Sequence, residues 1–134
     1  MTERTIGDVM TFGALTVSAD AGLSRAARLM DEYHVRGLAV VDADESLIGV
    51  ISQSDLVRAR VAADVWDSWG SLAVRHLMTT PAVTAPTSMT LSEAAKLMED
   101  KGIHRLIIVG HDGVTPEGIL STSDLIRDMT EARR

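Results

Sequence analysis

The sequence contains one stretch twice, as Leu47-Ile-Gly-Val-Ile-Ser-Gln-Ser-Asp55-Leu-Val-Arg58 and as Glu117-Gly-Ile-Leu-Ser-Thr-Ser-Asp124-Leu-Ile-Arg127. In each copy a short apolar run predicts a buried strand, and the Ser-x-Ser-Asp that follows predicts a helix start, because serine is a favoured N-cap and the acid lies three positions on. N–H groups at a helix start, beside hydroxyls and a carboxylate, can bind anions and sugar hydroxyls. Helix capping alone is the competing interpretation, and the duplication favours a paired ligand site.

The rest of the chain also repeats. Matching residues lie 68 positions apart in the first part of each half and 69 apart later, because the polar loop at residues 42–46 is replaced by a longer one at 110–116. A surface loop tolerates such an insertion. The matched pairs include Met10 and Met78, Leu23 and Leu91, Met30 and Met98, Gly49 and Gly118, and Asp55 and Asp124.

Each half predicts the order β-α-β-β-α after a short lead-in. Apolar residues at positions 23, 26, 27 and 30, and again at 91, 94, 95 and 98, have the spacing of one helix face. Thr90 and Glu93 form a capping-box pattern, Gly22 is the weaker cap of the first copy, and Gly102 predicts a helix end. Strands are expected near residues 15–17 and 82–84, and at 38–41, 47–51, 106–109 and 118–120.

One repeat of about 60 residues buries too little surface to be stable alone, and the continuous apolar strands indicate cover on both faces. We therefore predict an α/β (α+β) fold in which the two repeats pack about a pseudo-two-fold axis. The expected domains are residues 6–65 and 74–131, joined by a linker at 66–73. Trp66 and Trp69 lie outside the repeated pattern and are expected either to bury a dimer contact or to cover their own module.

Composition excludes several classes of function. Of the 134 residues, 46% are hydrophobic, which provides a core, and the net charge of −6 with a basic run only at Arg133-Arg134 argues against a nucleic-acid groove. There is no cysteine, and the four histidines share no metal-ligand spacing, so we expect no metal site. No apolar run is as long as a membrane span. These features predict a cytoplasmic protein that contacts neither membrane nor nucleic acid.

The ordered set of motifs resembles a CBS domain pair, or Bateman module, over nearly the whole chain. Besides the two Ser-x-Ser-Asp motifs, the resemblance rests on Val9-Met10-Thr11, Leu77-Met78-Thr79, Leu38-Ala-Val-Val-Asp42 and Arg105-Leu-Ile-Ile-Val109. It implies a free-standing regulatory module, not an enzyme, that forms a homodimer and serves an unidentified regulated protein. Its regulatory ligand would be AMP, ADP, ATP or S-adenosylmethionine, with no other cofactor. A scaffold or dimerisation module with vestigial ligand clefts is the alternative.

The resemblance also implies site residues. Asp55 and Asp124 would bind ribose, since a carboxylate can accept hydrogen bonds from both sugar hydroxyls. In the family, the serine–aspartate motif of one half works with the lead-in and strand edge of the other. The implied ligand-binding residues are Ser121, Ser123 and Asp124 with Met10, Val35, Arg36 and Gly37, and Ser52, Ser54 and Asp55 with Met78, Ile103, His104 and Arg105.

Two departures from the family pattern bear on these residues. Ala39 and Ile107 stand where the family often has proline at the strand edge. Arg105 occupies the position that Gly37 holds in the other half, so it would either contact phosphate or crowd the base. Arg58 and Arg127 would form i,i+3 ion pairs with the aspartates or lie on a solvated face.

Overall fold

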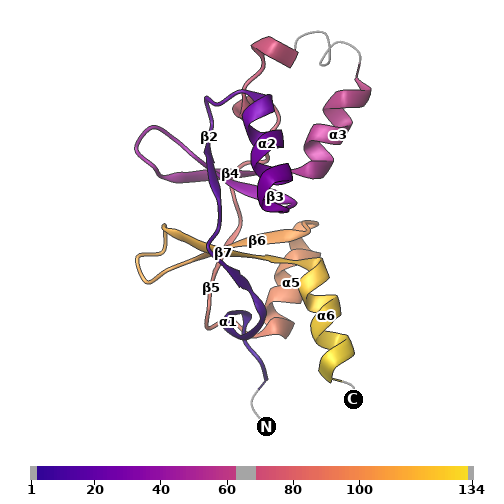
Figure 1. Cartoon of the computed structure of the whole chain (residues 1–134). Coiled ribbons are helices and arrows are strands. Elements are labelled where there is room, and N and C mark those ends of the chain that lie inside the picture. Colours follow the sequence, from indigo (N-terminus) through magenta and orange to yellow (C-terminus); the bar gives the residue numbers. More distant parts are fainter. Residues whose placement is uncertain (1–2, 63–68, 133–134) are drawn as a thin grey trace. The chain divides into compact units, whose positions relative to one another are not determined.

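The chain folds into two compact units that cross the repeat boundaries of the sequence. The computed structural model describes residues 3–62 and 69–132. Unit 1 consists of Met1–Ala14 together with Val83–Arg134, and unit 2 consists of Leu15–Ala82. Each unit has its own sheet, helices and core, and Figure 1 labels most of the elements of both.

Unit 2 is built on a three-stranded sheet in the order β2-β3-β4, in which β2 and β3 run parallel and β3 and β4 antiparallel. The helix α2 lies between the parallel strands in sequence, and α3 follows β4 directly. The elements are β2 Thr16–Ser18, α2 Leu23–Tyr33, β3 Gly37–Val41, β4 Leu47–Ser52, α3 Gln53–Val61, and the 3-10 helices η1 Trp69–Ser71 and η2 Val74–His76.

Unit 1 repeats this arrangement and adds a strand at one edge, giving the order β1-β7-β6-β5. Strand β1 pairs antiparallel with β7, with Thr11 opposite Ile119. The elements are α1 Ile6–Val9, β1 Thr11–Phe12, β5 Thr84–Pro86, α5 Leu91–Lys101, β6 Arg105–Val109, β7 Pro116–Ser121 and α6 Thr122–Ala132. The predicted order β-α-β-β-α is therefore confirmed in both units.

The lead-ins are exchanged between the repeats. The first one, which contains α1, packs on the body of the second repeat: Ile6 is fully buried there, and its N–H donates to the Met89 carbonyl at 2.8 Å. The second one packs on the body of the first repeat, where Thr79 exchanges backbone hydrogen bonds with Val50. Each unit is thus completed by a segment from the other repeat.

One strand lies two residues later than we predicted. The expected strand at residues 82–84 is Thr84–Pro86, paired in parallel with β6 from Thr84 opposite Ile107. The register places Ala85, rather than Val83, in the centre of the strand and in the core. Pro86 is tolerated because β5 is an edge strand, where a missing N–H breaks no ladder.

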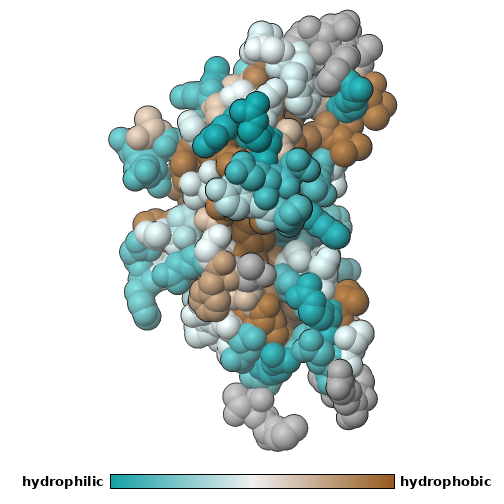
Figure 2. Space-filling view, viewed as in Figure 1, coloured by the Kyte–Doolittle hydropathy of each residue, from teal (hydrophilic) through white to brown (hydrophobic). Residues whose placement is uncertain are grey.

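The strands β3 and β6 are buried along most of their length. In β3 the side chains of Leu38, Ala39 and Val40 are all inaccessible to solvent, and Leu106, Ile107 and Ile108 are equally buried in β6. Consecutive buried residues confirm that these strands are covered on both faces. On the molecular face that Figure 2 displays, hydrophilic residues predominate and hydrophobic residues form separate patches.

The helix caps follow the sequence signals. The Thr90 hydroxyl accepts the N–H of Glu93 at 3.2 Å, and the Glu93 carboxylate accepts the N–H of Thr90 at 3.0 Å, so the predicted capping box is confirmed. Gly102 ends α5 in the left-handed conformation with φ 63°. In the equivalent helix α2, Gly22 is the N-cap, as predicted, and His34 is the C-cap in the same left-handed conformation.

Candidate functional site

The Asp124 corner, residues 121–124, joins β7 to α6 in unit 1. Ser121 is the last residue of β7, and its N–H and hydroxyl donate to Oδ2 of Asp124 at 2.8 and 3.1 Å. In return, the Asp124 N–H donates to the Ser121 hydroxyl oxygen at 3.4 Å. The aspartate therefore caps the helix that carries it, and one of its two oxygens is used for this purpose.

The Asp55 corner, residues 52–55, has the same geometry in unit 2. The Ser52 N–H and hydroxyl donate to Oδ2 of Asp55 at 2.8 and 3.0 Å, and the Asp55 N–H donates to the Ser52 hydroxyl oxygen at 3.2 Å. The predicted helix capping is confirmed in both copies. Capping and ligand binding are compatible, because a carboxylate offers about four acceptor positions.

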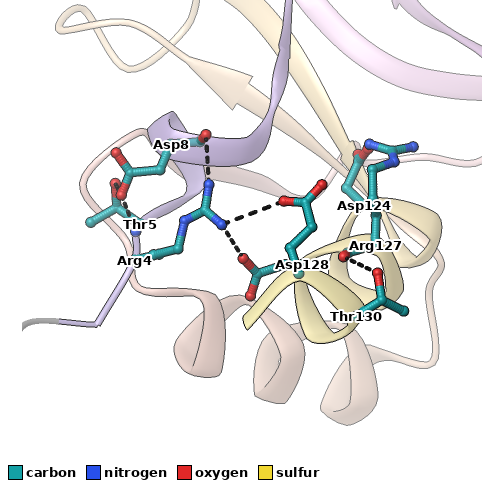
Figure 3. Close-up of polar contacts among 8 residues, drawn as sticks. Arg4, Thr5, Asp8, Asp124, Arg127, Asp128 and Thr130 are labelled. Carbon is teal, nitrogen blue, oxygen red and sulfur yellow. Dashed lines mark hydrogen bonds and ion pairs between the residues drawn. The ribbon is translucent and has the colours of Figure 1, made fainter. Parts of the chain in front are cut away.

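An arginine three residues later pairs with the second oxygen of each aspartate. Arg127 Nη1 lies 3.1 Å from Oδ1 of Asp124, and Arg58 Nη2 contacts Oδ1 of Asp55. Figure 3 shows Arg127 and Asp124 together on α6. Of the two interpretations of these arginines, the i,i+3 ion pair is confirmed.

The two aspartates are much less accessible than their neighbours. Asp55 and Asp124 are 8% and 7% exposed, whereas Ser54 and Ser123 are exposed to solvent. Within the described ranges, every buried side-chain nitrogen or oxygen has a hydrogen-bond partner. The aspartates of the corners are therefore held in position and shielded, as a hydrogen-bonding site for a sugar requires.

A strand edge lies beside each corner within the same unit. In unit 1 the His104 carbonyl accepts the N–H of Thr122 at 3.1 Å, and Arg105 lies opposite Ser121. In unit 2 the Arg36 carbonyl accepts the N–H of Gln53 at 2.9 Å, and Gly37 lies opposite Ser52.

The structure thus brings residues 103–105 to the Asp124 corner and residues 35–37 to the Asp55 corner. The expected ligand sites combine the Asp124 corner with residues 35–37, and the Asp55 corner with residues 103–105. Those combinations join residues of different units and stay a prediction.

The two methionines of the lead-ins lie in the units that the expected sites require. Met10 is buried in the core of unit 1, which carries Asp124. Met78 is half-buried against the core of unit 2, which carries Asp55. Each methionine therefore lies in the same unit as the aspartate with which it was predicted to act, and a shared ligand site stays a prediction.

Sequence reasoning missed the contacts that hold the first lead-in. Arg4 Nη1 lies 2.7 Å from Oδ1 of Asp128 on α6, and Asp8 accepts the Thr5 N–H at 2.8 Å (Figure 3). The Thr5-x-x-Asp8 spacing is a capping-box signal that could have revealed the short helix α1. The ion pair joins positions 124 residues apart, and no local pattern indicates it.

In the part of the chain that the structure describes, three acids outside the corners have depressed pKa values. The Thr5 N–H lowers the pKa of Asp8, and the Thr90 N–H lowers the pKa of Glu93. The Thr115 hydroxyl and N–H lower the pKa of Asp112 to about 2. All three carboxylates cap a helix or a turn. Among the described residues, no three His, Asp or Glu side chains are grouped so that they could hold a metal ion.

A family model assigns the two repeats. The model for the CBS domain matches residues 6–62 and again residues 74–131. The chain belongs to the CBS domain family. Its two CBS domains account for both Ser-x-Ser-Asp corners, and the resemblance stated from the motifs is thereby confirmed.

Relatives and solved structures agree with this assignment. The CBS domain-containing protein YhcV of Bacillus subtilis is 32% identical over 120 residues, which are 90% of this chain and 81% of that protein. The crystal structure of CBSX2 in complex with AMP matches with a TM-score of 0.78 at 28% identity, covering 98% of this chain and 99% of that one. The predicted fold class, a CBS pair of mixed α/β architecture, is confirmed.

Other relatives are longer than this chain. It spans 63% of an uncharacterized protein from Methanopyrus kandleri, which is 30% identical over 127 residues. It spans 23% of inosine-5'-monophosphate dehydrogenase from Nitrosopumilus maritimus, which is 29% identical over 119 residues. The likeness to the dehydrogenase thus concerns less than a quarter of that enzyme. None of the described helices of this CBS pair is long and apolar enough to cross a membrane.

Trp69 contacts its own CBS unit. The indole Nε1–H donates to the Ser24 hydroxyl at 3.1 Å, and the side chain packs against the core of unit 2. This contact favours the interpretation that Trp69 covers its own module. Trp66, the other tryptophan expected at a dimer contact, lies outside the described residues.

Proposed function

We propose that this CBS pair is a regulatory module that binds an adenosine-containing ligand, with Asp124 and Asp55 as its ribose-binding carboxylates. The observation that carries the proposal is the duplicated corner, in which a shielded aspartate is held by a serine at a helix start. The AMP bound in the similar CBSX2 structure supports this ligand class. AMP, ADP, ATP and S-adenosylmethionine are the candidate ligands.

The remaining site residues are proposed from the family pattern. Ser121, Ser123, Ser52 and Ser54 would contact sugar or phosphate at the helix starts. The strand edges at residues 35–37 and 103–105 would contact the adenine through backbone groups, and Met10 and Met78 would line the pocket walls. Of the basic side chains there, His104 is exposed and Arg105 half-buried, so both remain candidates for phosphate contact.

The decisive experiment measures ligand binding to the full chain by titration calorimetry. AMP, ADP, ATP and S-adenosylmethionine are compared on wild type, Asp124→Asn and Asp55→Asn. Loss of one charge-assisted hydrogen bond weakens binding roughly 10- to 100-fold. Glu93→Gln is the matched control, because Glu93 makes the same capping contacts outside the corners. Unchanged affinity in both aspartate variants would reject the ribose assignment.

We further propose that the module is a homodimer formed through α3 and α6. Both helices expose apolar side chains at equivalent positions, Val57 and Ile126, and each exposes a second one a turn later, Val61 and Met129. Helix α3 carries two arginines and one aspartate, whereas α6 carries three acids and one arginine. Because the two helices have opposite net charges, we expect α3 of one copy to pack against α6 of a second copy.

Light scattering tests the dimer. Wild type should have twice the mass of the chain, and Val57→Asp with Ile126→Asp should reduce it to the monomer. If wild type is a dimer but binds none of the four ligands in the calorimetric titration, the scaffold alternative with vestigial ligand clefts is favoured instead. We propose in addition that the module is cytoplasmic and that it regulates an unidentified protein. The proposal assigns no catalysis to the module.

A further inference from the structure

Each corner aspartate has few acceptor positions left for a sugar. Oδ2 of Asp124 already accepts two hydrogen bonds from Ser121, and Oδ1 is paired with Arg127. Asp55 is engaged in the same way by Ser52 and Arg58. Since a carboxylate has about four acceptor positions, a vicinal diol that donates two hydrogen bonds needs the position that the guanidinium occupies.

The arginine pairing is specific to the corners and is not a general property of capped helices here. In α5 the capping acid Glu93 also has a cation three residues later, Lys96. Its ammonium group instead lies 3.1 Å from Asp100, four residues further on. The guanidinium groups that turn back to Asp55 and Asp124 therefore mark the two corners.

The arginines can leave the aspartates more easily than the serines can. The side chains of Arg58 and Arg127 are 72% and 60% exposed, whereas the serine bonds belong to the helix caps. A guanidinium that turns away from its aspartate loses that ion pair. The loss is compensated only if the ligand offers a new anion. Phosphate and carboxylate groups suit the planar fork of arginine, which binds them through two parallel hydrogen bonds.

We propose that Arg58 and Arg127 are specificity-determining residues, each of which blocks one aspartate oxygen against neutral nucleosides and releases it to adenosine ligands that carry a phosphate or carboxylate group. This inference rests on the proposed function and adds to it the basis of ligand selection. A neutral nucleoside must displace the guanidinium without compensation. A ligand with a phosphate or carboxylate gives the displaced guanidinium a new partner.

Calorimetry with AMP, S-adenosylmethionine and adenosine on the full chain tests the inference. The variants are Arg58→Met, Arg127→Met and the double variant, since methionine keeps much of the stem without the charge. Lys96→Met is the matched control, because it removes an exposed helical ion pair elsewhere. In the double variant adenosine should bind more tightly and AMP more weakly, so that the ratio of AMP affinity to adenosine affinity falls about tenfold.

The dependence of adenosine affinity on salt concentration is a second readout. It would not change if the two arginines had only a structural role. Raising the KCl concentration screens the exposed guanidinium from the aspartate. Adenosine binding to wild type should therefore tighten with KCl, and this response should disappear in the double variant. An affinity ratio that stays unchanged in the double variant overturns the inference alone. A wild type that binds neither adenosine nor any of AMP, ADP, ATP and S-adenosylmethionine overturns the proposed function as well.

Discussion

His34 and Gly102 end equivalent helices in the same left-handed conformation, with φ values of 55° and 63°. Only glycine adopts this conformation without steric cost. His34→Gly should therefore stabilise the protein by about 0.5–1 kcal/mol, measured by urea unfolding. Gly102→Ala is the matched control and should destabilise by a similar amount. A less stable His34→Gly would mean that the imidazole makes a contact that outweighs the backbone cost.

Gly49 should not tolerate a side chain. A Cβ at this position would lie 2.7 Å from the Thr79 carbonyl oxygen and 3.1 Å from the Met78 sulfur. Gly49→Ala should cost about 1–3 kcal/mol, since the second lead-in must shift away from β4. At Gly70 no described residue other than its chain neighbours has an atom within 4 Å of such a Cβ, so Gly70→Ala should change the unfolding free energy by less than about 0.5 kcal/mol. Equal effects of the two substitutions would contradict the close approach.

Asp112 should make stability depend on pH in acid. Its pKa is about 2 in the folded protein against 3.8 for the free side chain. The folded state therefore binds fewer protons, and the contribution of Asp112 is complete above about pH 4 and lost as the pH falls toward 2. Asp112→Asn should lower the melting temperature at pH 6 but not at pH 2. Thr115→Val, which removes the hydroxyl donor, should narrow the pH range over which Asp112 changes the stability. If the difference in melting temperature between wild type and Asp112→Asn did not depend on pH, the assignment would be refuted.

The two corners should bind ligand unequally. By the family pattern, the Asp124 corner would work with Gly37, which lets a ring approach the backbone, whereas the Asp55 corner would work with the bulkier Arg105. We expect the tighter site at Asp124, so that Asp124→Asn removes the high-affinity phase of a calorimetric titration and Asp55→Asn spares it. Ligand bound only beside Asp55 would show that this order of affinities is wrong.

Trp69 should contribute to stability rather than to assembly. Its indole packs on the core of unit 2 and donates to Ser24. Trp69→Ala should lower the unfolding free energy by about 2 kcal/mol, less than for a fully buried indole. The mass from light scattering should remain that of wild type. A folded variant with a smaller mass would place Trp69 at the interface after all.

Local signals explain what could be predicted from the sequence. The helix and strand order, the Thr90 cap, the end at Gly102 and the serine–aspartate corners all depend on residues at most a few positions apart. The contacts of Arg4 with Asp128 and of Trp69 with Ser24 join distant positions and leave no such signal. The position of β5 was misjudged because its register is set by pairing with β6, not by its own apolar residues.

The direction of the corner arginines shows the same limit. Spacing alone allowed an ion pair or a solvated position for Arg58 and Arg127. It allows the same two possibilities for Lys96 on α5, which also lies three residues after a capping acid. In the structure the two arginines turn back to the capping acid and the lysine turns forward to Asp100. Such choices depend on side-chain packing around each helix, which periodicity does not encode.

The exchanged lead-ins have a consequence for the history of the chain. A solitary repeat would carry a lead-in like that of Ile6 but could not place it on its own body, because in this fold that segment completes the other repeat. An ancestral single-repeat protein of this design would have needed a second molecule with which to exchange lead-in segments. The present chain would then be two such interlocked molecules whose genes were fused, with the covalent link replacing an encounter between separate proteins.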